Sequence, residues 1–187
     1  RTSPHERMSS PSNTAGAKRG DIEGAKRAGL RVRALGTADL EAVVALDATL
    51  TGEAKPSYWG PVVDRFLTRK SCIALAASAA SAAGEPGGGL DGFLFGERRA
   101  FEFGSEACGW VLAVGVRMSA SRAGVASALM EQARRRFAAM GVSSVRTMVR
   151  RTDVPLLSFF RSQGFVGGPF VQLELGLEGG DSEESAP

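Results

Sequence analysis

The clearest pattern of apolar and polar positions lies in the middle of the chain, between residues 108 and 140. Residues 108–116 form a continuous apolar run without proline, which predicts a strand that is buried on both faces. From Val125 to Met140 apolar residues recur at steps of three and four with charged residues between them, which predicts an amphipathic helix. The residues that join the two, around Gly124, are small or polar. We therefore expect a strand, a short loop and a helix in direct succession.

Weaker patterns on both sides predict the remaining elements. Helical spacing predicts one helix capped by Thr37, a second at 57–69 and a short third one capped by Asp153. Glycine-rich residues 84–89 are expected to form the tip of a hairpin. Alternation of apolar and polar residues, or a short apolar run, predicts strands in the other segments. These segments are 30–35, 72–80, 90–95 with a continuation at 101–103, 145–149 and 170–175.

The composition divides the chain into three parts. Residues 1–29 are rich in Ser, Pro, Gly, Ala and basic residues and contain almost no large apolar side chain, so we expect a disordered basic extension. Residues 178–187 are polar and acidic, and a disordered tail is expected there as well. Residues 30–177 between them are long enough for one domain with an ordinary core.

Composition and charge exclude several classes of function. Apolar residues make up 43% of the chain and charged residues 23%, which is typical of a soluble globular protein. No apolar run approaches the ~20 residues of a membrane-spanning helix. Two cysteines and one histidine argue against a disulfide framework and a metal site, and favour the cytoplasm. The basic extension carries no interleaved aromatic residues, so nucleic-acid binding is not the favoured interpretation.

The succession of strand, loop and helix is suited to holding a phosphate group. The first turn of a helix leaves main-chain N–H groups without internal acceptors, and the aligned peptide dipoles make that end positive. Small residues let phosphates approach the main chain closely, and Ala123, Gly124 and Ala126 are small. Arg122 adds a positive charge that can pair with a phosphate oxygen, although it is equally explained as a solvated loop residue.

Two motifs narrow the choice of ligand. Residues 116–126, VRMSASRAGVA, resemble the acetyl-coenzyme A motif of the GNAT superfamily of N-acetyltransferases, since Gly124 and Ala126 match it. Met118 stands where the family often has Pro, and Ser121 where it has Arg or Gln, with an arginine one place later. Residues 158–165, SFFRSQGF, resemble the family's Phe-Tyr-x-x-x-Gly-Phe segment at its usual separation. On these motifs the chain is identified as a member of that superfamily over about residues 30–177.

The resemblance implies a fold, a reaction and a cofactor. The implied fold is α/β (α+β): a mixed, mostly antiparallel sheet of six to seven strands with helices on both faces and a splay beside the central strand. The implied reaction is transfer of acetyl from acetyl-CoA to a primary amine by direct attack. The pantetheine arm would pair with the central strand and the pyrophosphate would lie on the N–H groups of 122–127. The implied cofactor-binding residues are Val114, Gly115, Val116, Arg122, Ala123, Gly124, Val125, Ala126, Ser127, Asp153 and Phe160.

The resemblance leaves the catalytic groups incomplete. Phe160 stands at the position of a tyrosine that often protonates the leaving thiolate, and it has no proton to give. Expelling a thiolate of pKa ~8.5 near pH 7 is uphill by only about 2 kcal/mol, which a water, Ser158 or a helix end could offset. Trp110 stands where some relatives carry a glutamate, so Glu102 is the candidate general base. A solvent-exposed strand position is the alternative for Glu102.

Several interpretations remain open from sequence alone. Tyr58 and Trp59 either line an acceptor pocket beside the first two helices or pack between helix and sheet. Gly115 indicates a bulge or a ligand close to the main chain, or else makes room for a neighbouring side chain. The acceptor is a small molecule or a protein amine, and a homodimer is a reasonable expectation. Alternatives are a non-catalytic acyl-CoA sensor on the same fold, a nucleotide binder and a nucleic-acid module.

Overall fold

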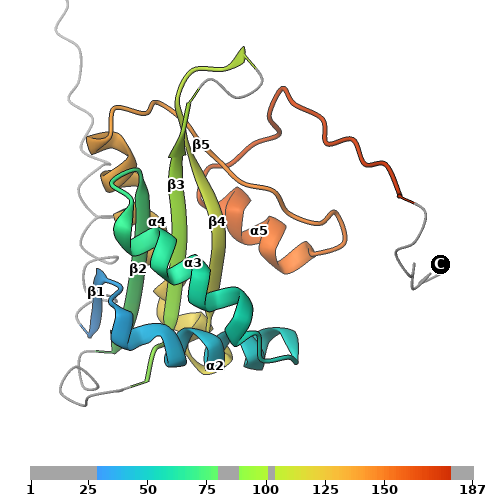
Figure 1. The fold of residues 1–187 in the computed structure, drawn as a ribbon. Coiled ribbons are helices and arrows are strands. Elements are labelled where there is room, and N and C mark those ends of the chain that lie inside the picture. The colour runs from blue at the N-terminus through green and yellow to red at the C-terminus, as the bar shows by residue number, and fades with distance from the viewer. Residues whose placement is uncertain (1–28, 80–88, 101–103, 178–187) are drawn as a thin grey trace, which may run out of the picture. The chain divides into compact units, whose positions relative to one another are not determined.

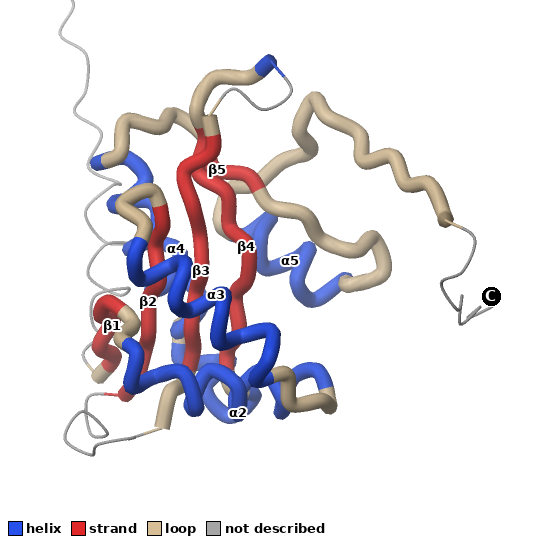
Figure 2. Tube along the Cα trace, in the orientation of Figure 1, coloured by secondary structure: helices blue, strands red, loops and turns tan. Residues whose placement is uncertain are grey.

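The computed structural model describes residues 29–79, 89–100 and 104–177 (Figures 1 and 2). The chain divides into two compact units, residues 1–148 and 149–187, and each unit is described by itself. The predicted disordered ends, the tip of the hairpin at 84–88 and the candidate base Glu102 lie outside the described residues.

The first unit is built on a five-stranded sheet whose strands follow one another in the order of the chain. The first four strands are antiparallel neighbours, and the last one runs parallel to the fourth. The sheet is therefore mixed and mostly antiparallel, as expected. Its strands are β1 (Leu30–Ala34), β2 (Cys72–Ala79), β3 (Gly92–Arg99), β4 (Cys108–Val116) and β5 (Val145–Arg146).

Helices connect these strands at the places where helical spacing was found. The central prediction is confirmed, because β4 is followed by a short 3-10 segment and then by a long helix. The 57–69 helix is also confirmed to within one residue at each end. In the second unit a short helix follows Asp153. The helical elements are η1 (Thr37–Asp39), α2 (Leu40–Thr51), α3 (Pro56–Thr68), η4 (Met118–Ala123), α4 (Val125–Ala139) and α5 (Val154–Ser162).

The core of the first unit lies where these helices pack on β2, β3 and β4. Phe93 and Phe95 of β3 pack against Trp59 and Phe66 of α3, with ring centroids 5.3–5.4 Å apart. The preceding residue, Gly92, faces the other way, since a Cβ there would lie 2.7 Å from Val125 of α4. Consecutive residues of a strand point to opposite faces, so α3 and α4 pack on opposite faces of β3 (Figure 1).

Glycines in β3 and β4 let α4 approach the sheet closely. A Cβ at Gly96 would lie 2.8 Å from the ring of Phe137, and one at Gly109 would lie 2.7 Å from it. Phe137 is fully buried. Gly96 was expected to interrupt the strand after residue 95, but β3 continues to Arg99 because this glycine lies beneath an aromatic ring inside the sheet.

One predicted strand does not form, and another is shorter than predicted. Residues 170–175 are irregular, and the alternating apolar side chains of Val171, Leu173 and Leu175 are 77–90% exposed. Alternation alone does not make a strand, because main-chain groups need a neighbour to pair with, and within the described residues this segment has none. Among the described residues the sheet has five strands, so the expected six to seven are not confirmed, and β5 covers only two of the residues 145–149. The predicted strand at 101–103 lies outside the described residues.

The helix caps follow the sequence only in part. Asp153 caps α5 as expected, since its carboxylate accepts a hydrogen bond of 3.0 Å from the Leu156 N–H. Thr37 does not cap α2. Asp39 occupies the N-cap position of α2 but makes no side-chain cap bond to that helix. Its carboxylate accepts a 2.8 Å bond from the Gly36 N–H at the start of η1 and two short bonds from Arg33. The bonds from Arg33 lower the pKa of the Asp39 carboxyl, and the Gly36 N–H lowers it further.

Candidate functional site

Strands β4 and β5 separate soon after they meet. β4 pairs with β5 only at Gly109 opposite Val145 and Trp110 opposite Arg146. One residue later the Thr147 hydroxyl donates a 3.1 Å hydrogen bond to the Val111 carbonyl. Beyond that point no strand among the described residues adjoins this side of β4 (Figure 2). An exposed strand edge of this kind binds an extended ligand by main-chain hydrogen bonds.

A β-bulge lies at the start of this edge. Phe95 of β3 is opposite Ala113, whereas the next residue, Gly96, is opposite Val111, so Leu112 has no partner in β3. Leu112 and Ala113 both pack against the core on the α3 side. The bulge therefore reverses the alternation of side chains between the two faces of β4. A bulge leaves main-chain groups of the extra residue outside the ladder, where they can meet a ligand.

Gly115 has a packing role, which is one of the interpretations left open by the sequence. It lies directly opposite Phe93, and a Cβ at position 115 would lie 2.7 Å from the Phe93 ring and 3.1 Å from Leu50 of α2. Gly115 thus makes room for a neighbouring side chain, and the bulge lies at Leu112. The neighbouring Val114 and Val116 are half-buried.

The far end of the strand edge leads to the start of α4. Arg117 fixes this corner, because its N–H donates 2.8 Å to the Asp91 carbonyl and its side chain donates 2.9 Å to the Leu90 carbonyl. The 3-10 segment η4 follows, and then Gly124 with φ +76° and open space around its α-carbon. The left-handed conformation at Gly124 turns the chain into α4 and favours glycine at this position.

Main-chain N–H groups gather at the start of α4. The Ala128 N–H donates 3.0 Å to the Gly124 carbonyl, which begins the intrahelical ladder. The amides of Val125 and Ala126 precede it and have no acceptor within the helix. Val125 is buried against Gly92, so it can offer a ligand only its main chain. Ala123 is exposed and Ser127 is half-buried, which leaves the approach to these amides open.

A positive charge stands beside these amides. Arg122 is exposed, and its guanidinium makes no ion pair or hydrogen bond with any residue that the structure describes. It belongs to the last turn of η4, three residues before Val125, the first residue of α4. An anion on the α4 amides would therefore meet a guanidinium whose donors are available, together with the positive end of the helix dipole.

The short helix of the second unit contains the remaining predicted residues. Ser158 is exposed, and Phe160 is 4% exposed with its ring 5.2 Å from Phe159 and 5.0 Å from Phe165. Asp153 uses one carboxylate oxygen to cap α5. Roles of these residues toward a cofactor or a thiolate stay predictions.

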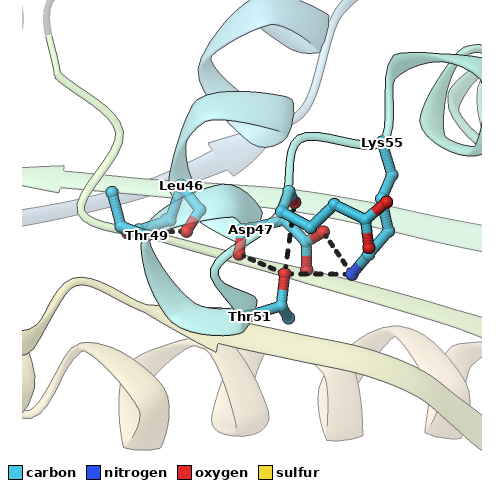
Figure 3. A network of polar contacts seen from close by, with 6 residues as sticks. Leu46, Asp47, Thr49, Thr51 and Lys55 are labelled. Atoms are coloured by element: carbon cyan, nitrogen blue, oxygen red, sulfur yellow. Dashed lines mark hydrogen bonds and ion pairs between the residues drawn. The ribbon is translucent and has the colours of Figure 1, made fainter.

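The junction of α2 and α3 is held by a polar network (Figure 3). Lys55 donates 2.9 Å to the Thr51 hydroxyl and lies 3.4 Å from the Asp47 carboxylate. The Thr51 hydroxyl in turn donates 3.0 Å to the Asp47 carbonyl. Because Leu50 of the same turn lies over Gly115, this junction adjoins the second half of β4.

The two aromatic residues at the start of α3 differ in exposure. Tyr58 is 50% exposed, whereas Trp59 is 3% exposed and packs against Phe93 and Phe95. Trp59 is thus a core residue that joins helix and sheet. Tyr58 packs edge-on against Trp59 at 5.1 Å and presents its other side to solvent, where it can meet an acceptor.

Sequence analysis missed one charged cluster. Glu97 of β3 has a side chain only 14% exposed, and it contacts Arg99 at 2.8 Å and Arg65 of α3 at 3.5 Å. Cys72 lies opposite Glu97 on β2. Burial, and next the charge of Glu97, raise the pKa of the Cys72 thiol, so this cysteine is not a ready nucleophile. Only the pairing of β3 with its neighbours brings these residues together.

Among the described residues no group of three or more His, Cys, Asp or Glu side chains is placed to hold a metal ion. Of the described helices, none combines the length and apolarity that a membrane crossing requires.

Comparisons with known proteins agree on one family. The model of the acetyltransferase (GNAT) family matches residues 40–165. Aminoglycoside N-acetyltransferase AAC(6')-Iy, solved with a bisubstrate analogue, is similar in structure with a TM-score of 0.67 and 16% identity, covering 79% of this chain and 98% of that one. The aminoglycoside 6'-N-acetyltransferase AAC(6')-Ig of Acinetobacter haemolyticus is similar with a TM-score of 0.64 and 18% identity, covering 79% of this chain and 99% of that one. An acetyltransferase of Trypanosoma brucei is similar with a TM-score of 0.60 and 22% identity, covering 79% of this chain and 99% of that one. No functionally curated protein matches the sequence significantly.

Proposed function

Because this chain belongs to the GNAT family of acetyltransferases, we propose that it moves an acetyl group from acetyl-CoA to the primary amine of a small molecule by direct attack. The observation that supports this most is the edge of β4 from Leu112 to Val116. It begins at a bulge, has no neighbouring strand among the described residues, and leads to the N-terminal amides of α4. Similar solved structures include a CoA complex and an enzyme with a CoA-linked aminoglycoside analogue.

In this proposal each part of the site binds one part of the donor. The pantetheine arm pairs with the main chain of 112–116 as an added strand. The pyrophosphate lies on the amides of Val125 and Ala126, and Arg122 neutralises part of its charge. A strand rises about 3.3 Å per residue, so the bulge lies roughly 13 Å from Val116 along the edge. That separation leaves room for an extended arm between phosphates and thioester.

The chemical step then takes place beside the bulge. The neutral amine attacks the thioester carbonyl, the C–N bond forms, and the C–S bond breaks when the tetrahedral intermediate collapses. A main-chain N–H at Leu112 or Ala113 stabilises the oxyanion of that intermediate. The thiolate leaves and takes up a proton from water. Glu102 is the proposed base that removes the proton of the amine.

Thermal unfolding tests cofactor and site together. Acetyl-CoA at ~100 times its Kd adds about 2.7 kcal/mol to the free energy of unfolding, whereas ATP and NAD are expected to add nothing. For a chain of this size that is a rise in Tm of about 5–11 °C. Free thiol release with a panel of amines then tests the reaction.

A matched pair of variants locates the binding. Gly124→Glu places a negative charge beside the α4 amides and is expected to abolish the shift with acetyl-CoA. Gly141→Glu is the control: Gly141 has φ +74° and open space as well, but it follows the other end of α4. Both variants carry the same backbone strain, so only a specific loss in Gly124→Glu supports the site. An equal shift with NAD or ATP, or equal losses in both variants, would count against the proposal.

A further inference from the structure

The Glu97 cluster has unused hydrogen-bond donors. A guanidinium has five N–H donors, and Arg65 makes one contact with Glu97 at 3.5 Å. Its Nε is buried and has no hydrogen-bond partner in the part of the chain that the structure describes. The guanidinium lies 4.7 Å over the ring of Phe66, which holds it in one place, and its side chain is 40% exposed. Arg65 is therefore a fixed cation with donors left for a second anion.

A second guanidinium lies on the same carboxylate. Arg99 contacts Glu97 at 2.8 Å, and its guanidinium lies 4.6 Å over the ring of Trp110. Glu97 is thus shared between Arg65 and Arg99, and the Arg65 contact is the longer one. Glu97 fills only part of the space around them, because its two oxygens are divided between the two side chains.

The cluster lies close to the proposed reaction centre. Glu97 is directly opposite Trp110 on β4, and Trp110 precedes the bulged Leu112 by two residues, which is roughly 7 Å along a strand. Arg65 comes from α3, so the cluster is on the face of the sheet that α2 and α3 cover. The junction of these two helices adjoins β4 on that same face. An acceptor that approaches the bulge from this side meets the cluster.

We infer that Arg65 binds a carboxylate of the acceptor, so that the substrate is an amine that also carries an acid group, such as an amino acid. This inference rests on the proposed function. A guanidinium binds a carboxylate through two parallel hydrogen bonds, which would also orient the amine. The same positive charge disfavours polycationic acceptors, so this chain differs in acceptor class from the aminoglycoside enzymes that it resembles in fold.

Matched acceptors that differ only in a carboxylate test the inference. The pairs are phenylalanine with phenethylamine and lysine with cadaverine, and kanamycin and spermidine serve as polycations. The carboxylate member of each pair is expected to have a kcat/KM at least about tenfold higher, which corresponds to ~1.4 kcal/mol. The effect is expected in KM, because the carboxylate binds away from the reacting atoms.

Variants of the cluster separate recognition from stability. Arg65→Ala is expected to lower kcat/KM for the carboxylate acceptors about tenfold and for their decarboxylated partners less than about twofold. Arg65→Lys keeps the charge and should recover part of the loss. Arg69→Ala removes the same charge one turn later in the exposed C-cap of α3 and is expected to change neither. Glu97→Gln removes the charge that Arg65 contacts and should increase the preference for the carboxylate.

Three results would overturn the inference. Equal losses for both members of a pair in Arg65→Ala would show a structural role only. Faster transfer to kanamycin or spermidine than to every carboxylate acceptor would refute the acceptor class and leave the proposed acetyltransferase function standing. The absence of an acetyl-CoA shift in Tm would remove the proposed function and this inference with it.

Discussion

Replacement of Gly115 by alanine tests whether packing or ligand approach requires a glycine in β4. The new Cβ would lie 2.7 and 2.8 Å from two carbons of the Phe93 ring and 3.1 Å from Leu50. Phe93 is 2% exposed and packs against Trp59 and Phe95, so its ring has no free space to move into. Overpacking of this kind costs about 1–3 kcal/mol, a fall in Tm of roughly 2–12 °C.

A double-mutant cycle identifies the clash. Phe93→Leu removes the ring atoms that the new methyl group meets, so Gly115→Ala combined with Phe93→Leu should be less destabilised than the sum of the single variants, by about 1 kcal/mol or more. Urea denaturation of all four proteins measures this coupling. Gly60→Ala is the control, because Gly60 lies in α3 with open space around its α-carbon, and alanine there should stabilise by about 0.5–1 kcal/mol.

The opposite result is equally informative. If Gly115→Ala unfolds at the temperature of the original protein but binds acetyl-CoA more weakly, the packing account is refuted, and the glycine is there for the ligand. A coupling energy near zero would likewise show that Phe93 does not limit the size of residue 115. Both quantities come from one set of purified proteins.

Other variants test the caps and the leaving group. Asp39→Asn should lower the free energy of unfolding by about 1–2 kcal/mol at pH 7. Because Arg33 lowers the folded-state pKa of Asp39, this difference should hold above pH ~4 and shrink as the pH falls further through the folded pKa. Urea titrations at several pH values measure it. Asp153→Ala removes the cap of α5 and should cost about 1 kcal/mol, with increased amide exchange at Leu156. Phe160→Tyr supplies a phenol where the family has its acid: a rise in kcat of about tenfold indicates that protonation of the thiolate is limiting, and an unchanged kcat that it is not.

The sequence was most informative where a long pattern repeats. The apolar run of β4 and the helical spacing of α4 are confirmed almost residue for residue, because each extends over many positions and is followed by its own stop signal. The family resemblance, read from 116–126 and 158–165, is confirmed as well. Short patterns were less reliable. Residues 170–175 alternate like a strand, yet alternation says nothing about a neighbour for the main chain.

The features that the sequence could not reveal depend on which residues of neighbouring elements lie opposite one another in the folded chain. Leu112 is an ordinary apolar residue in an apolar run, and only its missing partner in β3 makes it a bulge. Gly115 was linked to a ligand because Phe93, which needs the space, lies far from it in the sequence. Arg65 and Glu97 meet for the same reason, since α3 and β3 are joined only by the folded sheet. The candidate base Glu102 lies outside the described residues, and the sequence remains its only support.

Because β4 has one extra residue at its bulge, deletion of that single residue could remove the proposed reaction centre while the fold is kept. Val111 and Ala113 already face the consecutive residues Gly96 and Phe95, so deletion of Leu112 would leave every remaining residue of the strand with its present partner and its present face. Such a protein would keep a plain, continuous ladder, and besides the half-buried Leu112 side chain it would lose the irregularity at which we place the reacting carbonyl. Relatives of this chain that have lost that residue would retain the architecture as binders without turnover, and reinsertion of one amino acid would be the shortest route back to an enzyme.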